Sequence, residues 1–196
     1  MTLANSTSMS QSFSDFELSI KQAVTHILAG DIIAYPTETV YGLGCNAFQQ
    51  NALRTLQQLK QRSEDKSFIV LVADTLQARE LIHPEAEIQL IEAAKSWPGP
   101  TTWVFRARDH LPPELTLAGK VAIRISAHPM AQRLCALARC PIVSTSANLK
   151  NQTPLASAQS IYEAFKPYIA GIMQGEPGKE KPSKIIDAAT LEVLRD

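Results

Sequence analysis

The pattern of apolar and polar residues alternates along the chain between helical spacing and short apolar runs. Near the N-terminus, apolar residues recur at the spacing of one helix face, and Ser14 and Glu17 have the spacing of a capping box before them. Gly30 is expected to end this helix, because glycine favours the left-handed conformation found there. The apolar stripe consists of Phe16, Ile20, Val24, Ile27 and Leu28.

The rest of the chain continues the alternation. Further helices are predicted at residues 51–59, 76–82, 85–96, 129–138 and 157–165. Strands are predicted at 31–35, 68–73, 102–106, 121–125, 142–146 and 169–173, with two short strands near the C-terminus. The loop 175–182, rich in Gly, Pro and Lys, is expected to be mobile. This order predicts a single α/β domain at 14–196, and residues 1–13 are expected to form a disordered tail.

Composition agrees with one globular domain. Of 196 residues, 45% are hydrophobic and 19% are charged. A chain of this size buries roughly 70% of its unfolded surface, so it needs no disulfide or metal for stability. The formal net charge of zero argues against a globally attractive surface for nucleic acid or acidic lipid. Between Glu114 and Glu163 there are basic residues but no acidic ones, which indicates either a local positive cleft or a scatter of solvated charges.

The cysteines and the lengths of the apolar runs indicate the cellular compartment in which the protein is expected. The three cysteines form no C-x-x-C pair, so a reducing compartment is expected. No apolar run reaches the ~20 residues needed to cross a bilayer. The first residues also lack the basic start and apolar core of a signal peptide. We therefore expect a cytoplasmic protein without membrane contact.

Several common catalytic motifs are missing. The chain contains no H-E-x-x-H, G-x-S-x-G or G-x-G-x-x-G, the patterns of zinc proteases, hydrolases and Rossmann enzymes. The segment GEPGK at 175–179 has the wrong glycine spacing for a P-loop, and Glu180 follows where Ser or Thr should bind magnesium. The four histidines lack ligand spacing, so no metal site on the protein is expected.

A first candidate segment, PTETVYGLG at 36–44, follows an apolar strand. If it is extended, Thr37, Thr39 and Tyr41 point to one side and Glu38 and Val40 to the other. These hydroxyls would then emerge where open α/β sheets bind ligands. The alternative interpretation is a polar turn.

A second candidate segment, KQRSEDKS at 60–67, lies between a predicted helix and a predicted strand. If the chain becomes extended there, Lys60 and Arg62 project together, and Lys66 precedes the strand. Such cations can clamp a phosphate. They can equally serve only to favour the helix dipole.

A third candidate segment, PIVSTSAN at 141–148, ends an apolar strand with Ser144, Ser146 and Asn148 at alternate positions. Short hydrogen-bonding groups without a carboxylate suit phosphate or ribose oxygens, although they also form turns and caps. In VAIRIS at 121–126, Arg124 lies opposite an apolar face, and an arginine so placed seldom lacks an anionic partner. That partner is either structural or part of a ligand.

Taken together, these segments resemble the YrdC-like family, and in particular its short bacterial threonylcarbamoyl-AMP synthases of the TsaC type. The resemblance extends from about residue 32 to 187. It rests on motifs in the same order: AYPTETVYGLG, LKQR with Lys66, WPGPTT, VAIRISAHP, PIVSTSAN and PSKIIDA. The family's K-x-R and S-x-N tetrad falls on Lys60, Arg62, Ser146 and Asn148.

The resemblance implies a fold and an activity. The fold is a single domain with a twisted mixed sheet around a concave basic cavity. The reaction makes threonylcarbamoyl-adenylate and pyrophosphate from L-threonine, bicarbonate and ATP with Mg²⁺. Downstream transfer proteins, bound transiently, then modify tRNA adenosine next to the anticodon, and tRNA itself is not expected to bind strongly.

The resemblance also implies roles for individual residues. The tetrad is catalytic. Lys60, Lys66, Ser144, Ser146, Asn148 and Ser183 bind nucleotide, and Thr37, Thr39, Tyr41 and Arg124 bind threonine or carbamate.

The chain departs from the family pattern in a few places. Ser63 stands where Pro usually follows K-x-R, Ser67 follows the later lysine, and Leu149, Lys150 and Asn151 replace the usual x-S-G.

Two other functions fit the same segments. A binding module for structured RNA would use the basic surface without catalysis, although zero net charge and 6% aromatic residues argue against it. A nucleotide-binding regulator would bind ATP without dependence on threonine.

Overall fold

A computed structural model describes residues 13–61, 66–149 and 152–196. Helices and 3₁₀ turns are η1 (Phe13–Phe16), α1 (Ile20–Ala29), α2 (Gln50–Leu59), α3 (Thr75–Ala78), η2 (Pro84–Gln89), α4 (Leu90–Ala93), η3 (Pro113–Leu115), α5 (Pro129–Ala138) and α6 (Ala158–Phe165). Strands are β1 (Glu17–Leu18), β2 (Ile33–Pro36), β3 (Tyr41–Gly44), β4 (Ile69–Leu71), β5 (Thr101–Arg106), β6 (Thr116–Leu117), β7 (Lys120–Arg124), β8 (Ile142–Ser146), β9 (Gly171–Met173), β10 (Lys184–Asp187) and β11 (Val193–Arg195). The predicted tail at 1–13 lies almost wholly outside the described residues.

The strands form one mixed sheet in the order β1-β9-β2-β3-β8-β4-β7-β5-β10-β11, with β6 beside β7. The sheet contains both parallel pairs, such as β4 with β7, and antiparallel pairs, such as β2 with β3. Strand β8 joins the halves of this sheet. Its first residues, Ile142 to Ser144, pair with β4, whereas Thr145 and Ser146 pair with β3. The predicted α/β class with a mixed sheet is therefore confirmed.

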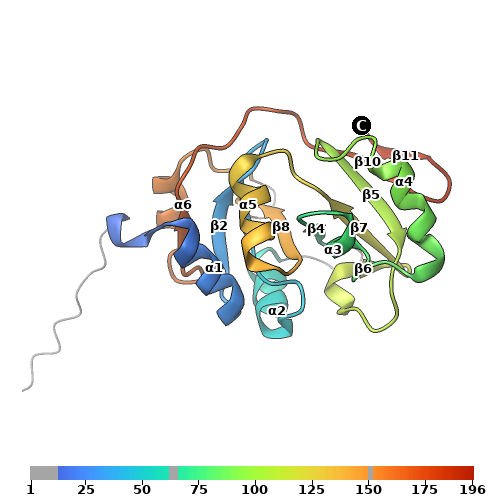
Figure 1. Cartoon of the computed structure of the whole chain (residues 1–196). Coiled ribbons are helices and arrows are strands. Elements are labelled where there is room, and N and C mark those ends of the chain that lie inside the picture. Colours follow the sequence, from blue (N-terminus) through green and yellow to red (C-terminus); the bar gives the residue numbers. More distant parts are fainter. Residues whose placement is uncertain (1–12, 62–65, 150–151) are drawn as a thin grey trace, which may run out of the picture.

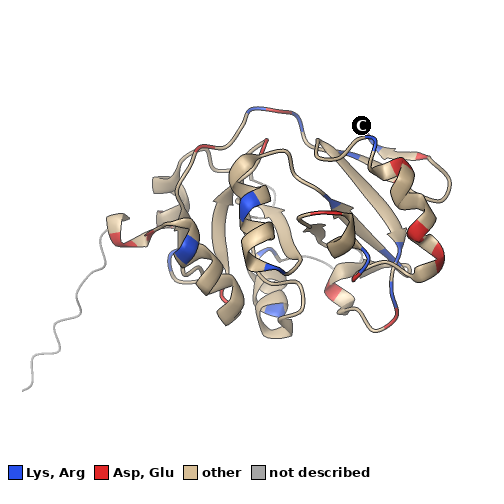
Figure 2. Cartoon of the chain, in the orientation of Figure 1, with Lys and Arg blue, Asp and Glu red and all other residues tan. Residues whose placement is uncertain are grey.

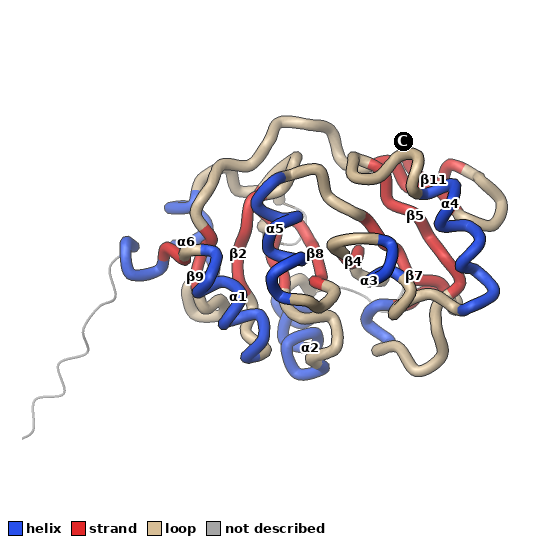
Figure 3. Tube along the Cα trace, viewed as in Figure 1, coloured by secondary structure: helices blue, strands red, loops and turns tan. Residues whose placement is uncertain are grey.

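Helices cover both faces of the β2 and β8 half of the sheet. Alternate residues of a strand point to opposite faces, and Ile33 and Tyr35 of β2 belong to one apolar cluster while Ala34 belongs to another. The first cluster includes α1 and α5, which lie in front of β2 and β8 in Figure 1. The second includes the buried residues of α2 and α6. Figure 3 shows these strands between the helices.

The other half of the sheet is covered by shorter helices. Its core is contributed by β5 and β7 together with α3 and α4, and Phe105, Ile123 and Leu81 are fully buried. The segments predicted as helices at 76–82 and 85–96 are mostly shorter or 3₁₀ in the structure. Pro84 begins a tight 3₁₀ turn there, and Ile88 and Ile91 remain exposed.

The first helix begins later than predicted. Ser19, rather than Ser14, is the N-cap, and it forms a capping box with Gln22. The chain before it is drawn into the sheet, because Glu17 and Leu18 pair with β9. Gly30 ends the helix as predicted, in the left-handed conformation. Leu28, expected inside, is exposed.

Two further observations complete the fold. Within the part of the chain that is described, no helix is long and apolar enough to cross a membrane. Cys45, Cys135 and Cys140 are buried free thiols. Burial raises the pKa of the Cys45 thiol to about 12 and that of Cys140 to about 11, so these thiols stay protonated at neutral pH.

Candidate active site

A cavity of about 450 Å³ lies where the halves of the sheet meet. Its walls come from the turn between β2 and β3, from β4 and β8, from the end of β7, and from the segment 180–183 together with β11. The position follows from β8, which pairs with strands of both halves and so brings their ends together. Segments far apart in the sequence therefore face one space.

The segment PTETVYGLG forms a hairpin turn, so the expected extended alternation is wrong at 37–40. Thr37 donates from its backbone N–H and from its Oγ1 to the carbonyl of Val40, at 3.2 and 2.6 Å. This local bonding reverses the chain, and Pro36 pairs with Tyr41. As a result Thr37, Glu38, Thr39 and Val40 all line the cavity, whereas the extended conformation would have placed them on opposite sides.

Gly44 explains why this hairpin lies so close to β8. A Cβ at this position would be 2.2 Å from the Val143 carbonyl oxygen. Glycine is therefore required for strand packing here.

Glu38 is the centre of a buried polar cluster, the Glu38 hub, made of Glu38, Arg124, Ser126 and Ala127. Its Oε1 lies 2.6 Å from Arg124 Nη2 in an ion pair and accepts a hydrogen bond from the Ala127 backbone N–H at 2.6 Å. Its Oε2 accepts from Ser126 Oγ at 2.9 Å. Burial alone would raise the pKa of Glu38, but the Arg124 guanidinium and these hydrogen bonds lower it below its ordinary value. The anionic partner expected for Arg124 is thus Glu38.

A long loop, the strap (residues 175–183), joins the two halves of the molecule (Figure 1), and its residues Glu180, Pro182 and Ser183 line the cavity. Gly178 and Glu180 donate backbone hydrogen bonds to the carbonyls of Thr37 and Glu38, at 2.8 and 3.0 Å. The Tyr41 hydroxyl donates to the Gly175 carbonyl at 2.7 Å. A Cβ on Gly178 would be 2.1 Å from the Glu38 carbonyl oxygen, so only glycine fits there.

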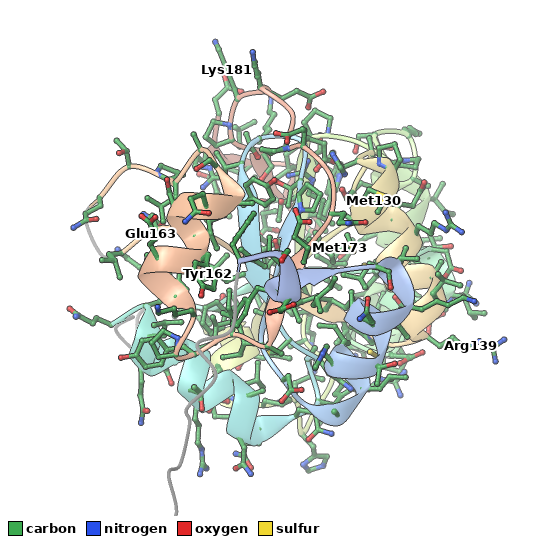
Figure 4. The ribbon with its side chains drawn as sticks, turned by 90° about the vertical axis from the view of Figure 1, so that its left-hand side faces the viewer. Met130, Arg139, Tyr162, Glu163, Met173 and Lys181 are labelled. Carbon is green, nitrogen blue, oxygen red and sulfur yellow. The ribbon has the colours of Figure 1, made fainter. Side chains whose placement is uncertain are left out.

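The strap is also hydrogen-bonded near its first residue, and its crest (residues 179–181) carries charged side chains. His128 Nδ1 accepts from the Met130 N–H, and Nε2 then donates to the Glu176 carbonyl at 3.1 Å. Lysine and glutamate alternate along the crest of the strap (Figure 2). Lys181 projects from this crest away from the body of the protein (Figure 4).

The far wall combines β5, β10 and β11 around Ser183. The Ser183 hydroxyl lies 2.9 Å from the Thr102 hydroxyl, and its carbonyl accepts from Arg195 Nη2 at 2.6 Å. Arg195 lines the cavity as Arg124 does. Burial, and secondarily the charge of Arg124, lower the pKa of Arg195 below its ordinary value. The wall thus holds an arginine that the sequence did not single out.

Lys60 and the end of β8 form a second polar cluster, the β8 corner (Lys60, Ser146, Asn148). Lys60 Nζ donates to the Ser146 carbonyl at 2.7 Å and to the Asn148 carbonyl and Oδ1, each at 2.5 Å. Ser146 Oγ donates to the same Oδ1 at 2.7 Å. The ammonium is therefore oriented by neutral oxygens, and the predicted association of Lys60 with the S-x-N pair is present in the structure.

One interpretation of the sequence has an extended chain directly after Lys60. In the structure the chain is not extended at Gln61. Gln61 has φ 44, in the left-handed region. Lys66 is exposed, and the described residues that line the cavity include Ser144 and Ser146 but not Lys60, Lys66 or Asn148. Arg62, Ser63 and Lys150 lie outside the described residues.

Glu38, Ser126 and Arg195 are the site residues that the sequence did not predict. Glu38 had been assigned to the side opposite the threonines, because an extended chain was assumed. The isolated arginine in β7 indicates that a buried anion is needed, and this is the signal that could have pointed to Glu38. Arg195 had no such signal, since it reaches the cavity only through the pairing of β11 with β10.

Among the residues that the structure describes, no group of three or more His, Cys, Asp or Glu side chains could hold a metal ion. The described cavity lining carries Arg124 and Arg195 together with Glu38 and Glu180. The carboxylate of Glu38 is already bonded to the hub. The two arginines suit an anionic ligand.

Sequence comparisons agree with this geometry. A family model of the Sua5, YciO and YrdC proteins, described as "Telomere recombination", matches residues 25–196. A threonylcarbamoyl-AMP synthase of Xylella fastidiosa (strain M23) is 40% identical over 185 residues, 91% of this chain and 97% of the relative. One from Coxiella burnetii (strain RSA 493 / Nine Mile phase I) is 38% identical over 183 residues, 92% of this chain and 98% of the relative.

Solved structures share the fold. P. abyssi Sua5 complexed with L-threonine superposes with a TM-score of 0.81 at 30% identity, covering 91% of this chain and 55% of Sua5. This chain thus spans about half the length of that protein. E. coli YciO, with a TM-score of 0.74 and 22% identity over 92% of this chain and 96% of YciO, shows the fold alone. The chain belongs to the Sua5/YciO/YrdC family.

Proposed function

We propose that this protein is a threonylcarbamoyl-AMP synthase, which forms threonylcarbamoyl-adenylate and pyrophosphate from L-threonine, bicarbonate and ATP. The observation that carries the proposal is the similarity to proteins of that name, at 40% identity over 97% of their length. The threonine bound to P. abyssi Sua5 supports the amino-acid substrate. The reaction class is nucleotidyl transfer to a carbamate oxygen.

The threonine side of the site is proposed to be the Glu38 hub and the hairpin turn. Arg124 has a planar fork of donors that matches a carboxylate, and Thr37 and Thr39 line the cavity beside it. Tyr41 also lines the cavity, although its hydroxyl donates to the strap. A contact of Tyr41 with threonine remains a prediction.

The nucleotide side is proposed to be the β8 corner with Ser144, Ser183 and Arg195. Ser144 and Ser146 line the cavity, and their hydroxyls are proposed to bond phosphate or ribose oxygens; for Ser146 this requires its O–H to leave Asn148 Oδ1. Lys60 supplies positive charge beside them. Arg62 and Lys66 are proposed to extend this charge along the triphosphate, as the family motif implies.

The chemistry requires no protein nucleophile. The threonine amine and bicarbonate give a carbamate with loss of water. One carbamate oxygen then attacks the α-phosphorus of ATP, and the bond to the β-phosphate oxygen breaks to release pyrophosphate. Lys60, Arg62 and Lys66 would stabilise the charge that develops on the phosphoryl oxygens. Mg²⁺ is proposed to enter with ATP on phosphate oxygens and water, as this ion prefers, and to neutralise charge there.

The product is proposed to pass to transfer proteins that modify tRNA, through transient contacts, in the cytoplasm. The chain itself is proposed to bind tRNA weakly. Its relatives of full length carry the name of the synthase alone. A separate transfer step therefore fits this chain.

The test is an incubation of the purified protein with ATP, Mg²⁺, bicarbonate and each amino acid in turn, followed by measurement of pyrophosphate. Threonine should stimulate release far more than other amino acids. An RNA-binding module would bind structured RNA in a salt-sensitive manner without turnover, and a nucleotide-binding regulator would bind ATP without threonine dependence. No stimulation by threonine would contradict the proposed function.

A further inference from the structure

We propose that Glu38 is a positioning residue for threonine: its carboxylate holds the Arg124 guanidinium in the orientation that receives the carboxylate of the substrate. The inference rests on the proposed function. It assigns a role to a residue that the comparisons leave without one.

Two nitrogens of Arg124 are held by the protein. Nε donates to the Gly99 carbonyl at 2.9 Å, and Nη2 lies 2.6 Å from Glu38 Oε1. No described residue accepts a hydrogen bond from Nη1. In the described part of the chain, the buried side-chain atoms without a partner are Gln89 Oε1 and Glu114 Oε2, so Nη1 is accessible. Because Arg124 lines the cavity, the accessible edge of its guanidinium faces the ligand space.

Glu38 is itself fixed from several directions. Its side chain is 6% exposed, it forms an ion pair with Arg124, and it accepts hydrogen bonds from Ser126 Oγ and the Ala127 backbone N–H. These donors come from β7 and from the loop that leads to α5. The carboxylate therefore cannot rotate without breaking several charge-assisted hydrogen bonds, which are stronger than neutral ones. A side chain held in this way can define the angle of the guanidinium that it contacts.

The backbone of Glu38 connects the same position to the strap. Its carbonyl accepts from Glu180 N, and the neighbouring Thr37 carbonyl accepts from Gly178 N. Glu38 thus links Arg124, the hairpin turn and the strap. A buried ion pair is by itself weak grounds for a stability role, whereas this one lies in the cavity wall between the groups that would surround threonine.

Glu38 is poorly placed to act as a general base. Three donors already occupy its oxygens, and its lowered pKa makes it a weaker proton acceptor than an ordinary carboxylate. Its contribution is therefore geometric. A displacement of about 1 Å in a substrate-positioning group can reduce turnover on the order of a hundredfold.

The test compares Glu38→Gln, which keeps the shape, and Glu38→Asp, which keeps the charge but shortens the side chain. In steady-state pyrophosphate release, both are expected to lower kcat/KM for threonine at least about tenfold, because either change moves the guanidinium. The KM for ATP should stay within about twofold. A wild-type threonine KM in both variants, or tighter threonine binding in Glu38→Gln, would overturn the positioning role.

A double-mutant cycle tests whether Glu38 acts through Arg124. In an Arg124→Lys background, Glu38→Gln should lower kcat/KM by less than about threefold, because coupled residues are not additive. A second full tenfold loss would show that Glu38 acts by another route. The cycle uses lysine so that a cation remains opposite Glu38.

Glu114→Gln is the matched control, since Glu114 is also a buried carboxylate but does not line the cavity. Its threonine and ATP KM values should equal those of the wild type. An equal threonine defect in Glu114→Gln would reduce the effect to general loss of a buried charge. If the wild type releases no pyrophosphate with threonine, the proposed function fails; if it does and the Glu38 variants match it, only this inference fails.

Discussion

The Glu38 hub and the β8 corner adjoin the same cavity, yet they hold their cations in different ways. In the hub, a carboxylate 6% exposed pairs with the guanidinium of Arg124 at 2.6 Å. In the corner, the ammonium of Lys60 donates to carbonyl and amide oxygens of Ser146 and Asn148. Those oxygens orient the ammonium of Lys60.

This difference in how the cations are held implies different roles: the hub contributes to stability and geometry, and the corner contributes positive charge to the reaction. Removing one member of a buried ion pair leaves the other uncompensated, so the hub is coupled to the stability of the fold. The corner lies at the end of a strand, where neutral acceptors can return to water. We therefore expect changes in the hub to affect folding and threonine geometry, and changes in the corner to affect mainly the rate of the reaction.

The largest expected effect is on stability in the hub. Arg124→Met leaves Glu38 buried without its cation and should lower the free energy of unfolding by about 3–5 kcal/mol. Urea unfolding followed by circular dichroism measures it. The control is Arg106→Met, which removes an exposed pair with Glu85 and should cost about 0–1 kcal/mol. Equal losses in the two variants would remove the distinction between hub and surface.

The next effect is on catalysis in the corner. Lys60→Ala should reduce threonine-dependent pyrophosphate release by a few hundredfold, since losing a charge-stabilising donor costs about 3–4 kcal/mol of activation free energy. Its melting temperature should stay close to that of the wild type. Lys95→Ala, in an exposed pair with Glu92, should leave the rate unchanged. Near-normal turnover in Lys60→Ala would remove the proposed role of the corner.

A smaller effect is expected where the strap meets the hub. Gly178→Ala places a Cβ against the Glu38 carbonyl, so the strap must shift and lose the bonds to Thr37 and Glu38. At about 1 kcal/mol for each hydrogen bond, its attachment should weaken by about 2 kcal/mol. Limited trypsin digestion should then cut faster after Lys179. Unchanged cleavage kinetics would mean that the strap is held elsewhere.

The hub also predicts a pH dependence. The folded pKa of Glu38 lies below its unfolded value, so the stability that it contributes is present above the unfolded pKa and is lost as pH falls through the folded pKa. One such group changes stability by at most about 1.4 kcal/mol per pH unit. Thermal melts from pH 6 to pH 3 should fall less steeply in Glu38→Gln than in the wild type. Parallel curves would assign the acid sensitivity to other carboxylates.

The smallest effect concerns backbone strain beside the corner. Gln61 is left-handed, a conformation that costs roughly 1–2 kcal/mol for residues with a Cβ. Gln61→Gly should raise stability by at most about 1 kcal/mol, because the freer unfolded chain offsets part of the relief. Gln61→Ala, which keeps the strain, is the control. If Gln61→Gly is less stable than Gln61→Ala, the conformation is not strained.

Helices and strands could be predicted from the sequence where the apolar pattern and the residues at the ends of the element indicate the same bounds. The bounds of α5 and β8 equal the predicted 129–138 and 142–146, because His128 and Pro129 mark the helix start and a clean apolar run leads into the serines. The start of α1 was misplaced, since Leu18 is drawn into pairing with Met173, far away in sequence. Local patterns carry no information about such distant partners.

In the site, too, some features follow from the local sequence and others depend on residues far apart in the chain. Parity along β8 separates the cavity residues only in part, because Ser144 and Ser146 line the cavity but so does Thr145, and Asn148 does not. It failed in the hairpin, where a side-chain hydrogen bond of Thr37 reverses the chain. The pairing of Glu38 with Arg124 depends on strand order, and the placement of Arg195 depends on the last strand pair. Both are properties of the assembled sheet.

The position of β9 has a consequence for how the protein folds. Residues 171–173 lie between β1 and β2, which both occur within the first 36 residues. During synthesis the edge of β2 that pairs with β9 therefore stays unpaired until β9 has been synthesised. Pairings of such high contact order are slow to form, and an open strand edge can pair with another chain. Refolding should accordingly be limited by the arrival of β9, and a chaperone that shields this edge should raise the yield.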